Sequence, residues 1–178
     1  MSKREVKHDG GSAVIRDVIL GGQDGLVNVF GVVLAVAEAT DTRYIILISG
    51  LAAAFAESIS MAAVAYTSGR AGEEYYRGKR KSISEEFAHP VRDAFVVGVA
   101  AIVGSFIPLL PFIFLPVSTA FWTAIGVSTL TLFASGAVKA KYTGANAFKS
   151  AVEMAVVGMT AAIAGYLIGA ALGALPLA

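Results

Sequence analysis

The sequence predicts an all-α integral membrane protein with five transmembrane helices. Of its 178 residues, 56% are hydrophobic and only 15% are charged, whereas about a quarter of the residues in a soluble domain are charged. The charged residues are clustered, which leaves five runs of about 20 residues, long enough to cross a hydrocarbon core about 30 Å thick. Backbone groups inside lipid must pair within the segment, so these runs are helices, and weak alternation argues against a β-barrel. The predicted helices cover residues 18–39, 44–66, 94–115, 117–138 and 151–174.

The first two predicted helices carry polar residues at membrane depth. Asp24 and Asn28 lie in the first, and Glu57 and Met61 lie in the second, with no Lys or Arg in either helix to pair with the acids. An ionisable side chain inside a bilayer is costly, so such residues indicate function. At about 1.5 Å per residue, Asn28 and Glu57 both come to mid-bilayer, and Asp24 comes to the level of Met61. The two helices are therefore expected to face each other and form a ladder of cation ligands.

Small or polar residues also recur along the first helix at steps of three and four. They form one stripe from Asp17 through Gly31 to Glu38, which is expected to mark the outer mouth of the path. Glu38 alone equally fits an interfacial residue that reaches water. The stripe is too long for one helix to cover, so it predicts a two-fold dimer in which Gly31 lies close to its counterpart. Val33 lies off the stripe and is expected to face lipid.

The remaining helices carry packing signals. Pro108 and Pro111 in the third remove backbone donors and distort its outer end, either as a packing kink or to expose carbonyls to a cavity. The fourth is predicted from its apolar length alone. The fifth contains Gly165, Gly169 and Gly173, a spacing that lets another helix approach closely, within the protomer or across a dimer.

The basic residues predict the orientation. Thirteen of the fourteen lie on one side if the N-terminus is cytoplasmic, and only Arg43 lies outside. The C-terminus is then outside, and residues 68–93 form a short cytoplasmic loop on a single membrane domain, residues 1–178. That loop is expected to be a solvated charged segment or, alternatively, to capture metal transiently. The residues that would capture metal are Glu73, Glu74, Glu85, Glu86 and His89.

The ligand types suggest which ion uses the path. Carboxylate and amide oxygens suit hard divalent cations, whereas the thioether of Met61 favours later transition metals. The mixture favours Fe²⁺, with Mn²⁺ and Co²⁺ as alternatives. Met61 taken alone also fits a packing residue. The chain has no cysteine, which excludes disulfides and thiolate metal sites.

At these residues the sequence resembles the vacuolar iron transporter family, whose members move cytosolic Fe²⁺ into vacuoles. The matching segments are Arg16-Asp17-Val18-Ile19, Asp24-Gly25-Leu26-Val27, Phe30-Gly31, Ser60-Met61-Ala62-Ala63, Tyr66, Ile107-Pro108-Leu109-Leu110-Pro111 and the glycine-rich fifth helix. The resemblance implies a homodimer with the ion path between subunits, Fe²⁺/H⁺ antiport, and Asp24 and Met61 as path ligands. The family glutamate two turns before the methionine is Ala53 here, and Glu57 stands one turn before it instead. The long glutamate-rich domain of many relatives is reduced here to the short loop.

Three functions fit these features. The first is a proton-coupled exporter of divalent metal from the cytosol. The second is a passive channel with the same ligands, and the third is a membrane protein that binds or oxidises metal without passage. Titratable ligands favour proton coupling, because metal binding to carboxylates displaces protons. The expected partners are the bilayer, divalent metal ions, protons and a second copy. No prosthetic group, nucleic acid or enzymatic activity is expected, and the membrane is the cell membrane of a prokaryote or a vacuole-like membrane otherwise.

Overall fold

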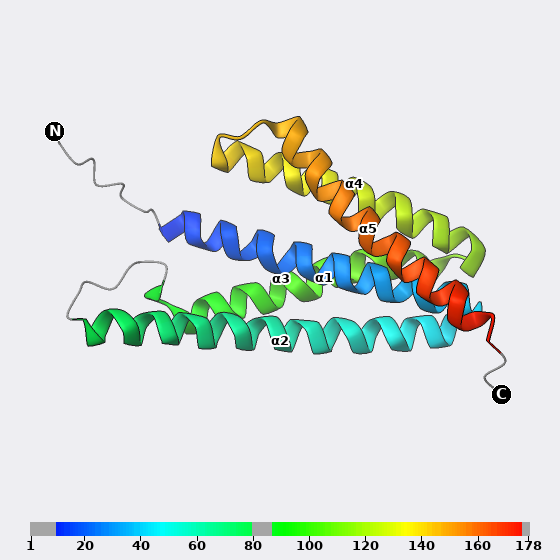
Figure 1. Ribbon diagram of the computed structural model, residues 1–178, viewed down its shortest axis with the longest axis horizontal. Helices are drawn as coiled ribbons and strands as arrows, with labels where there is room; N and C mark the ends of the chain where they lie inside the picture. The colour runs from blue at the N-terminus through cyan, green and yellow to red at the C-terminus, as the bar shows by residue number, and fades with distance from the viewer. Residues whose placement is uncertain (1–9, 80–86, 176–178) are drawn as a thin grey trace.

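The computed structural model describes residues 10–79 and 87–175, which form five helices and, within those ranges, no strand. All five helices are long and apolar enough to cross a membrane, which confirms the predicted fold class. They lie side by side along the long axis of the molecule, and the first helix begins at the opposite end of the bundle from the one where the last helix ends (Figure 1). The helices are α1 (Gly10–Thr40), α2 (Arg43–Gly78), α3 (Pro90–Phe114), α4 (Val117–Thr143) and α5 (Ala147–Gly173).

The helix ends differ from the predicted ones. α2 continues to Gly78, so residues 68–78, which were expected in a loop, form its last turns. α3 begins at Pro90, a residue that suits the first helical turn because no backbone donor is needed there. The predicted helices end too early because an apolar run in the sequence ends where charged residues begin. A helix can continue past the membrane surface with its charged side chains in water.

α1 is the central helix of the bundle. Val29 and Val33 are fully buried in one core cluster, which also contains residues of α2, α3 and α4. Leu26, Phe30 and Leu34 are buried in a second cluster with α4 and α5. The expectation that Val33 faces lipid is therefore wrong, because the helix has neighbours on both of these sides.

Glycines bring α5 close to α1. A β-carbon on Gly165 or Gly169 of α5 would overlap the backbone of α1, at Gly31 and Ala35 respectively. Membrane helices associate through such close packing, because lipid tails are as apolar as the side chains and no hydrophobic effect drives the helices together. The glycines of α5 thus pack inside the protomer, which decides between the two alternatives that their spacing left open.

The prolines of α3 do not end it. Pro108 and Pro111 are both buried, and the helix runs on through them to Phe114. Their burial agrees with a packing role. Leu109, between them, is also buried and contacts the position of Gly50 on α2.

Candidate metal centre

The structure brings Asp24, Asn28 and Glu57 together. Asp24 and Asn28 are one turn apart on α1, and Asn28 Nδ2 donates a long hydrogen bond of 3.4 Å to Asp24 Oδ2. The side chain of Glu57 on α2 lies close to both of them. Two carboxyl groups and one amide therefore meet between α1 and α2. The sequence predicted that Asn28 and Glu57 lie at the same depth in the membrane.

Packing on either side of Glu57 explains how α2 presents it. Ala54 and Ser58 are buried, and Ser58 Oγ donates a 2.7 Å hydrogen bond to the carbonyl oxygen of Gly98 on α3. Gly98 leaves room for this contact, since a β-carbon there would meet Ala62 at 3.1 Å. These contacts set the rotation of α2, which leaves Glu57 at the edge of its buried face.

The cluster is open on one side. Asp24 and Glu57 are half-buried and Asn28 is exposed on the surface of the protomer. Within the described part of the chain, no three or more His, Cys, Asp or Glu side chains converge as a metal site would require. Hard divalent cations take about six oxygen ligands. One protomer thus supplies part of a coordination shell, and water or another subunit must supply the rest.

Met61 lies one turn beyond Glu57, towards the end of the bundle where α1 begins. It lines a cavity of about 400 Å³ together with Asp17 and Leu20 of α1. The sequence placed Met61 level with Asp24, whereas this cavity places it beside residues nearer the start of α1. Counting residues from an assumed membrane surface misses this shift, because side-chain packing sets the register of two helices.

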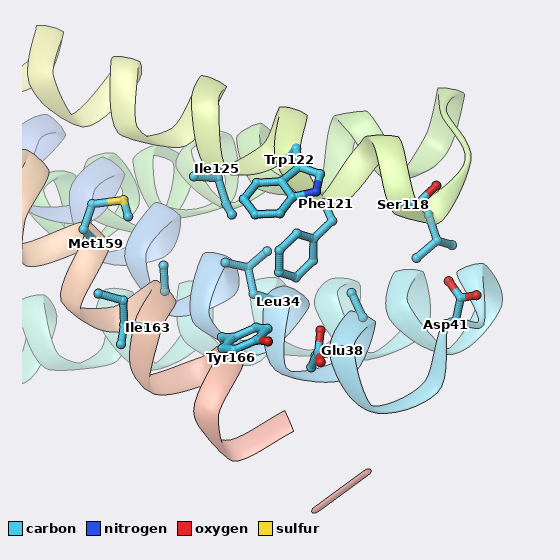
Figure 2. Close-up of a pocket in the computed structure, with 13 residues that line it drawn as sticks. Leu34, Glu38, Asp41, Ser118, Phe121, Trp122, Ile125, Met159, Ile163 and Tyr166 are labelled. Carbon is cyan, nitrogen blue, oxygen red and sulfur yellow. The ribbon is translucent and has the colours of Figure 1, made fainter. Parts of the chain in front are cut away.

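Glu38 lies apart from the cluster, near the opposite end of the bundle. It is exposed and lines a separate cavity of about 520 Å³ between α1, α4 and α5. Figure 2 shows Glu38 beside Tyr166, with Phe121 and Trp122 on the far side of this pocket. Glu38 therefore faces a different set of helices from Asp24.

The polar stripe on α1 is consequently not one open face. Asp17 is buried between α1, α2 and α3, whereas Gly31 and Ala35 lie under α5. The expectation that Gly31 approaches its counterpart in a dimer is wrong, because α5 of the same chain packs on it. Small residues along a helix mark close contacts as readily as a polar path.

Some of the acidic residues that were expected to capture metal form ion pairs with arginines of α2. Glu73 lies between Arg70, at 3.1 Å, and Arg77, at 2.6 Å. Glu74 is exposed and lies 3.6 Å from Arg70. His89 is exposed directly before α3. Glu85 and Glu86 lie outside the described residues.

One pair of acidic residues was not recognised as a pair from the sequence. Asp17 of α1 and Asp93 of α3 are both buried, and both line the cavity that contains Met61. The available signal was a repeated dipeptide, since Arg16-Asp17 and Arg92-Asp93 each lie near the start of a predicted helix.

Comparison with known proteins identifies the family. The model of the VIT family matches residues 15–89 and 78–170. Vacuolar iron transporter 1 of Tulipa gesneriana is 25% identical over 93% of this chain and 90% of its own length. An uncharacterized protein of Methanocaldococcus jannaschii is 26% identical over 89% of this chain and 90% of its own. Vacuolar iron transporter homolog 1 of Oryza sativa subsp. japonica is 29% identical over 85% of this chain and 71% of its own.

The plant relatives are transporters by name, not enzymes, and their similarity extends over most of this chain. Together with the five spanning helices, this similarity makes the protein a multi-pass integral membrane protein. The chain belongs to the VIT family.

Proposed function

We propose that this protein carries Fe²⁺ out of the cytosol in exchange for protons, as a homodimer whose ion path runs between α1 and α2 of both subunits. The observation that carries the proposal is the meeting of Asp24, Asn28 and Glu57 on an open surface. Mn²⁺ is the second candidate ion, because oxygen donors accept it equally well.

Membrane depth explains why this cluster requires a function. Asn28 lies about 18 Å from the end of α1 at Thr40, and Glu57 about 21 Å from the start of α2 at Arg43. Both positions are deep in a hydrocarbon core about 30 Å thick. An acid at the centre of a membrane helix costs about 2.5–3.5 kcal/mol, so two acids facing lipid would be a large liability. A second subunit that covers them, and a cation that neutralises them, remove that cost.

The exposed face of α2 suits contact with a second subunit. Ala52, Ala56, Ser60 and Ala63 are exposed at steps of three and four beside Glu57. Small residues at this spacing let membrane helices approach closely. A two-fold axis along this face would bring two copies of the Asp24–Asn28–Glu57 cluster together, giving four carboxyl groups and two amides.

Proton exchange follows from the donor chemistry. A metal ion binds carboxylates in the deprotonated form, so its binding releases any protons that Asp24 and Glu57 hold. When the metal leaves on the other side, protons can return. Met61, one turn away, adds a softer donor that favours Fe²⁺ over Mn²⁺.

The distribution of charge supports a cytoplasmic N-terminus. Among the described residues, Arg43 is the basic side chain at the end of the bundle where α5 ends. The others lie at or beyond the opposite end: Arg16, Arg70, Arg77, Lys79, Arg92, Lys139, Lys141 and Lys149. Basic residues accumulate on the cytoplasmic side of membrane proteins.

Uptake into liposomes tests the proposal and separates it from its alternatives. Purified protein should move Fe²⁺ into liposomes faster when the lumen is more acidic than the outside, because the outward proton gradient then drives metal inward. Metal entry should in turn drive protons out. A passive channel would move metal at a rate independent of the pH gradient. A protein that stores or oxidises metal would bind it in proportion to protein, with no accumulation in the liposome lumen.

A further inference from the structure

The cavity at the N-terminal end of the bundle has polar walls. Its volume is about 400 Å³, and its lining includes Asp17, Asp93, Ser68 and Met61. Phe87 bounds it and also packs on α2, with its ring 5.9 Å from that of Tyr76. This space is large enough for a cation with several waters.

Two buried carboxyl groups meet this cavity, each beside an arginine. Asp17 is 2% exposed, and its Oδ1 accepts a hydrogen bond of 3.0 Å from Arg16 Nη2. Asp93 is 6% exposed, and its Oδ1 accepts one of 2.8 Å from Arg92 Nη2. Asp17 Oδ2 is buried and has no hydrogen-bond partner among the described residues. A buried carboxylate oxygen without a partner is costly, which indicates that a bound species completes it.

We propose that this cavity is a second cation site, which holds a divalent metal ion with part of its water shell through Asp17 Oδ2, Asp93 and Met61. Carboxylate oxygens with one thioether suit the same borderline ions as the central cluster. Arg16 and Arg92 each donate to Oδ1 of the neighbouring aspartate, so neither arginine occupies the Oδ2 atom. Arg16 has a side chain 48% exposed, so water screens its charge more than that of buried Asp17.

The two arginines also make the site weak. With two carboxylates and two guanidinium groups, the empty cluster is close to neutral, so a metal ion gains less here than at the central carboxyl pair. Weak, exchangeable binding is what a step on a conduction path requires. The site is thus suited to brief occupancy rather than storage.

Its position links it to the central cluster. Asp17 lies seven residues before Asp24 on α1, about 10 Å along the helix, and Met61 lies one turn from Glu57 on α2. Met61 therefore lies on the side of the second site that is nearer to the central cluster. The role of the cavity as a step on the route rests on the proposed function, whereas metal binding in it does not.

Thiol labelling can test the site, because the chain has no cysteine of its own. Ser68→Cys places a thiol at the cavity wall, where a small cationic methanethiosulfonate reagent reacts with it. Mn²⁺ at about ten times its Kd should slow this labelling about tenfold, because few sites are then empty. Ala145→Cys, in the exposed turn between α4 and α5, is the matched control and should label at the same rate with and without Mn²⁺.

Two substitutions decide whether Mn²⁺ acts through this site. Asp17→Asn and Asp93→Asn, each added to Ser68→Cys, should abolish the protection while the protein elutes as a single species with unchanged helix content. Asp93→Asn keeps the test decisive if Asp17→Asn fails to fold. Protection should persist in Asp24→Asn, in which transport is lost, so that the two proposals can fail separately. Absence of protection in the parent, or protection unchanged by Asp93→Asn, would overturn the second site.

Discussion

Gly165 of α5 lies against the carbonyl oxygen of Gly31 of α1, with no room for a β-carbon between the two helices. One turn further on, Gly169 lies in the same way against Ala35. These contacts attach α5 to the helix that carries Asp24 and Asn28. The glycines of α5 therefore stabilise the position of the candidate metal centre without touching it.

Replacing Gly165 by Ala should destabilise the protein by about 1–3 kcal/mol, because the added methyl group overlaps backbone that cannot move aside. Gly126→Ala is the matched control, since nothing lies within 4 Å of a β-carbon there. That change should be neutral or stabilising by about 0.5–1 kcal/mol, because alanine favours the helix. Unfolding in mixed micelles, followed by helix content, measures both. Equal effects would mean that α5 does not pack on α1 as described.

Asp24→Asn should abolish metal transport without unfolding the protein. The amide keeps the size of the side chain but removes the charge that offsets desolvation of a divalent cation. Glu57→Gln should have the same effect if the Glu57 carboxyl replaces the family glutamate absent at Ala53. Thermal stability should be unchanged or higher, since a half-buried acid is lost.

Asp41→Asn is the control for these two variants. Asp41 is exposed in the turn between α1 and α2 and has a φ of 46°, a conformation that asparagine also accepts. It should transport like the parent in the same liposome assay. Proton-driven Fe²⁺ uptake at the parent rate in Asp24→Asn would refute the proposed path.

Met61→Leu should weaken Fe²⁺ transport more than Mn²⁺ transport. Leucine keeps the volume and apolarity of the side chain but lacks the sulfur donor, and softer ions depend more on that donor. The measurement is the ratio of apparent KM values for the two ions in variant and parent. An equal change for both ions would show that Met61 serves only in packing.

Cysteine cross-linking should reveal the subunit interface. Ala56→Cys, on the exposed small-residue face of α2, should form a disulfide with its counterpart under mild oxidation. Ala164→Cys, on the exposed face of α5, is the matched control and should remain monomeric on a denaturing gel. Cross-linking at Ala164 and not at Ala56 would place the dimer axis on α5 instead.

The glutamates near the α2–α3 connection give a further prediction. Replacing Glu73, Glu74, Glu85 and Glu86 by Gln should leave the maximum transport rate unchanged. If these residues collect metal, the apparent affinity should fall, and if they only solvate the surface it should not. Loss of their ion pairs with Arg70 and Arg77 should cost about 0–1 kcal/mol each, because such surface pairs are weak. Loss of all transport in a folded variant would contradict both alternatives.

The sequence alone determined the fold class and most of the chemistry. Five apolar runs of about 20 residues cross lipid as helices, since only helices and closed barrels satisfy their backbone groups there and a barrel strand is about half as long. Asp24, Asn28 and Glu57 stood out because polar groups at membrane depth are rare and costly. Counting the helical rise also placed Asn28 level with Glu57, which the structure brings together.

Only the tertiary structure decided how the helices are rotated and paired. Helical spacing put Gly31 on the same stripe as Asp24, yet α5 covers Gly31 and leaves Asp24 half-buried. Helical spacing also could not show that Asp17 and Asp93, which are distant in sequence, line one cavity. The physical reason is that hydropathy and periodicity are properties of a single helix. Rotation and register between helices depend on which side chains of different helices fit together, such as Gly165 on Gly31.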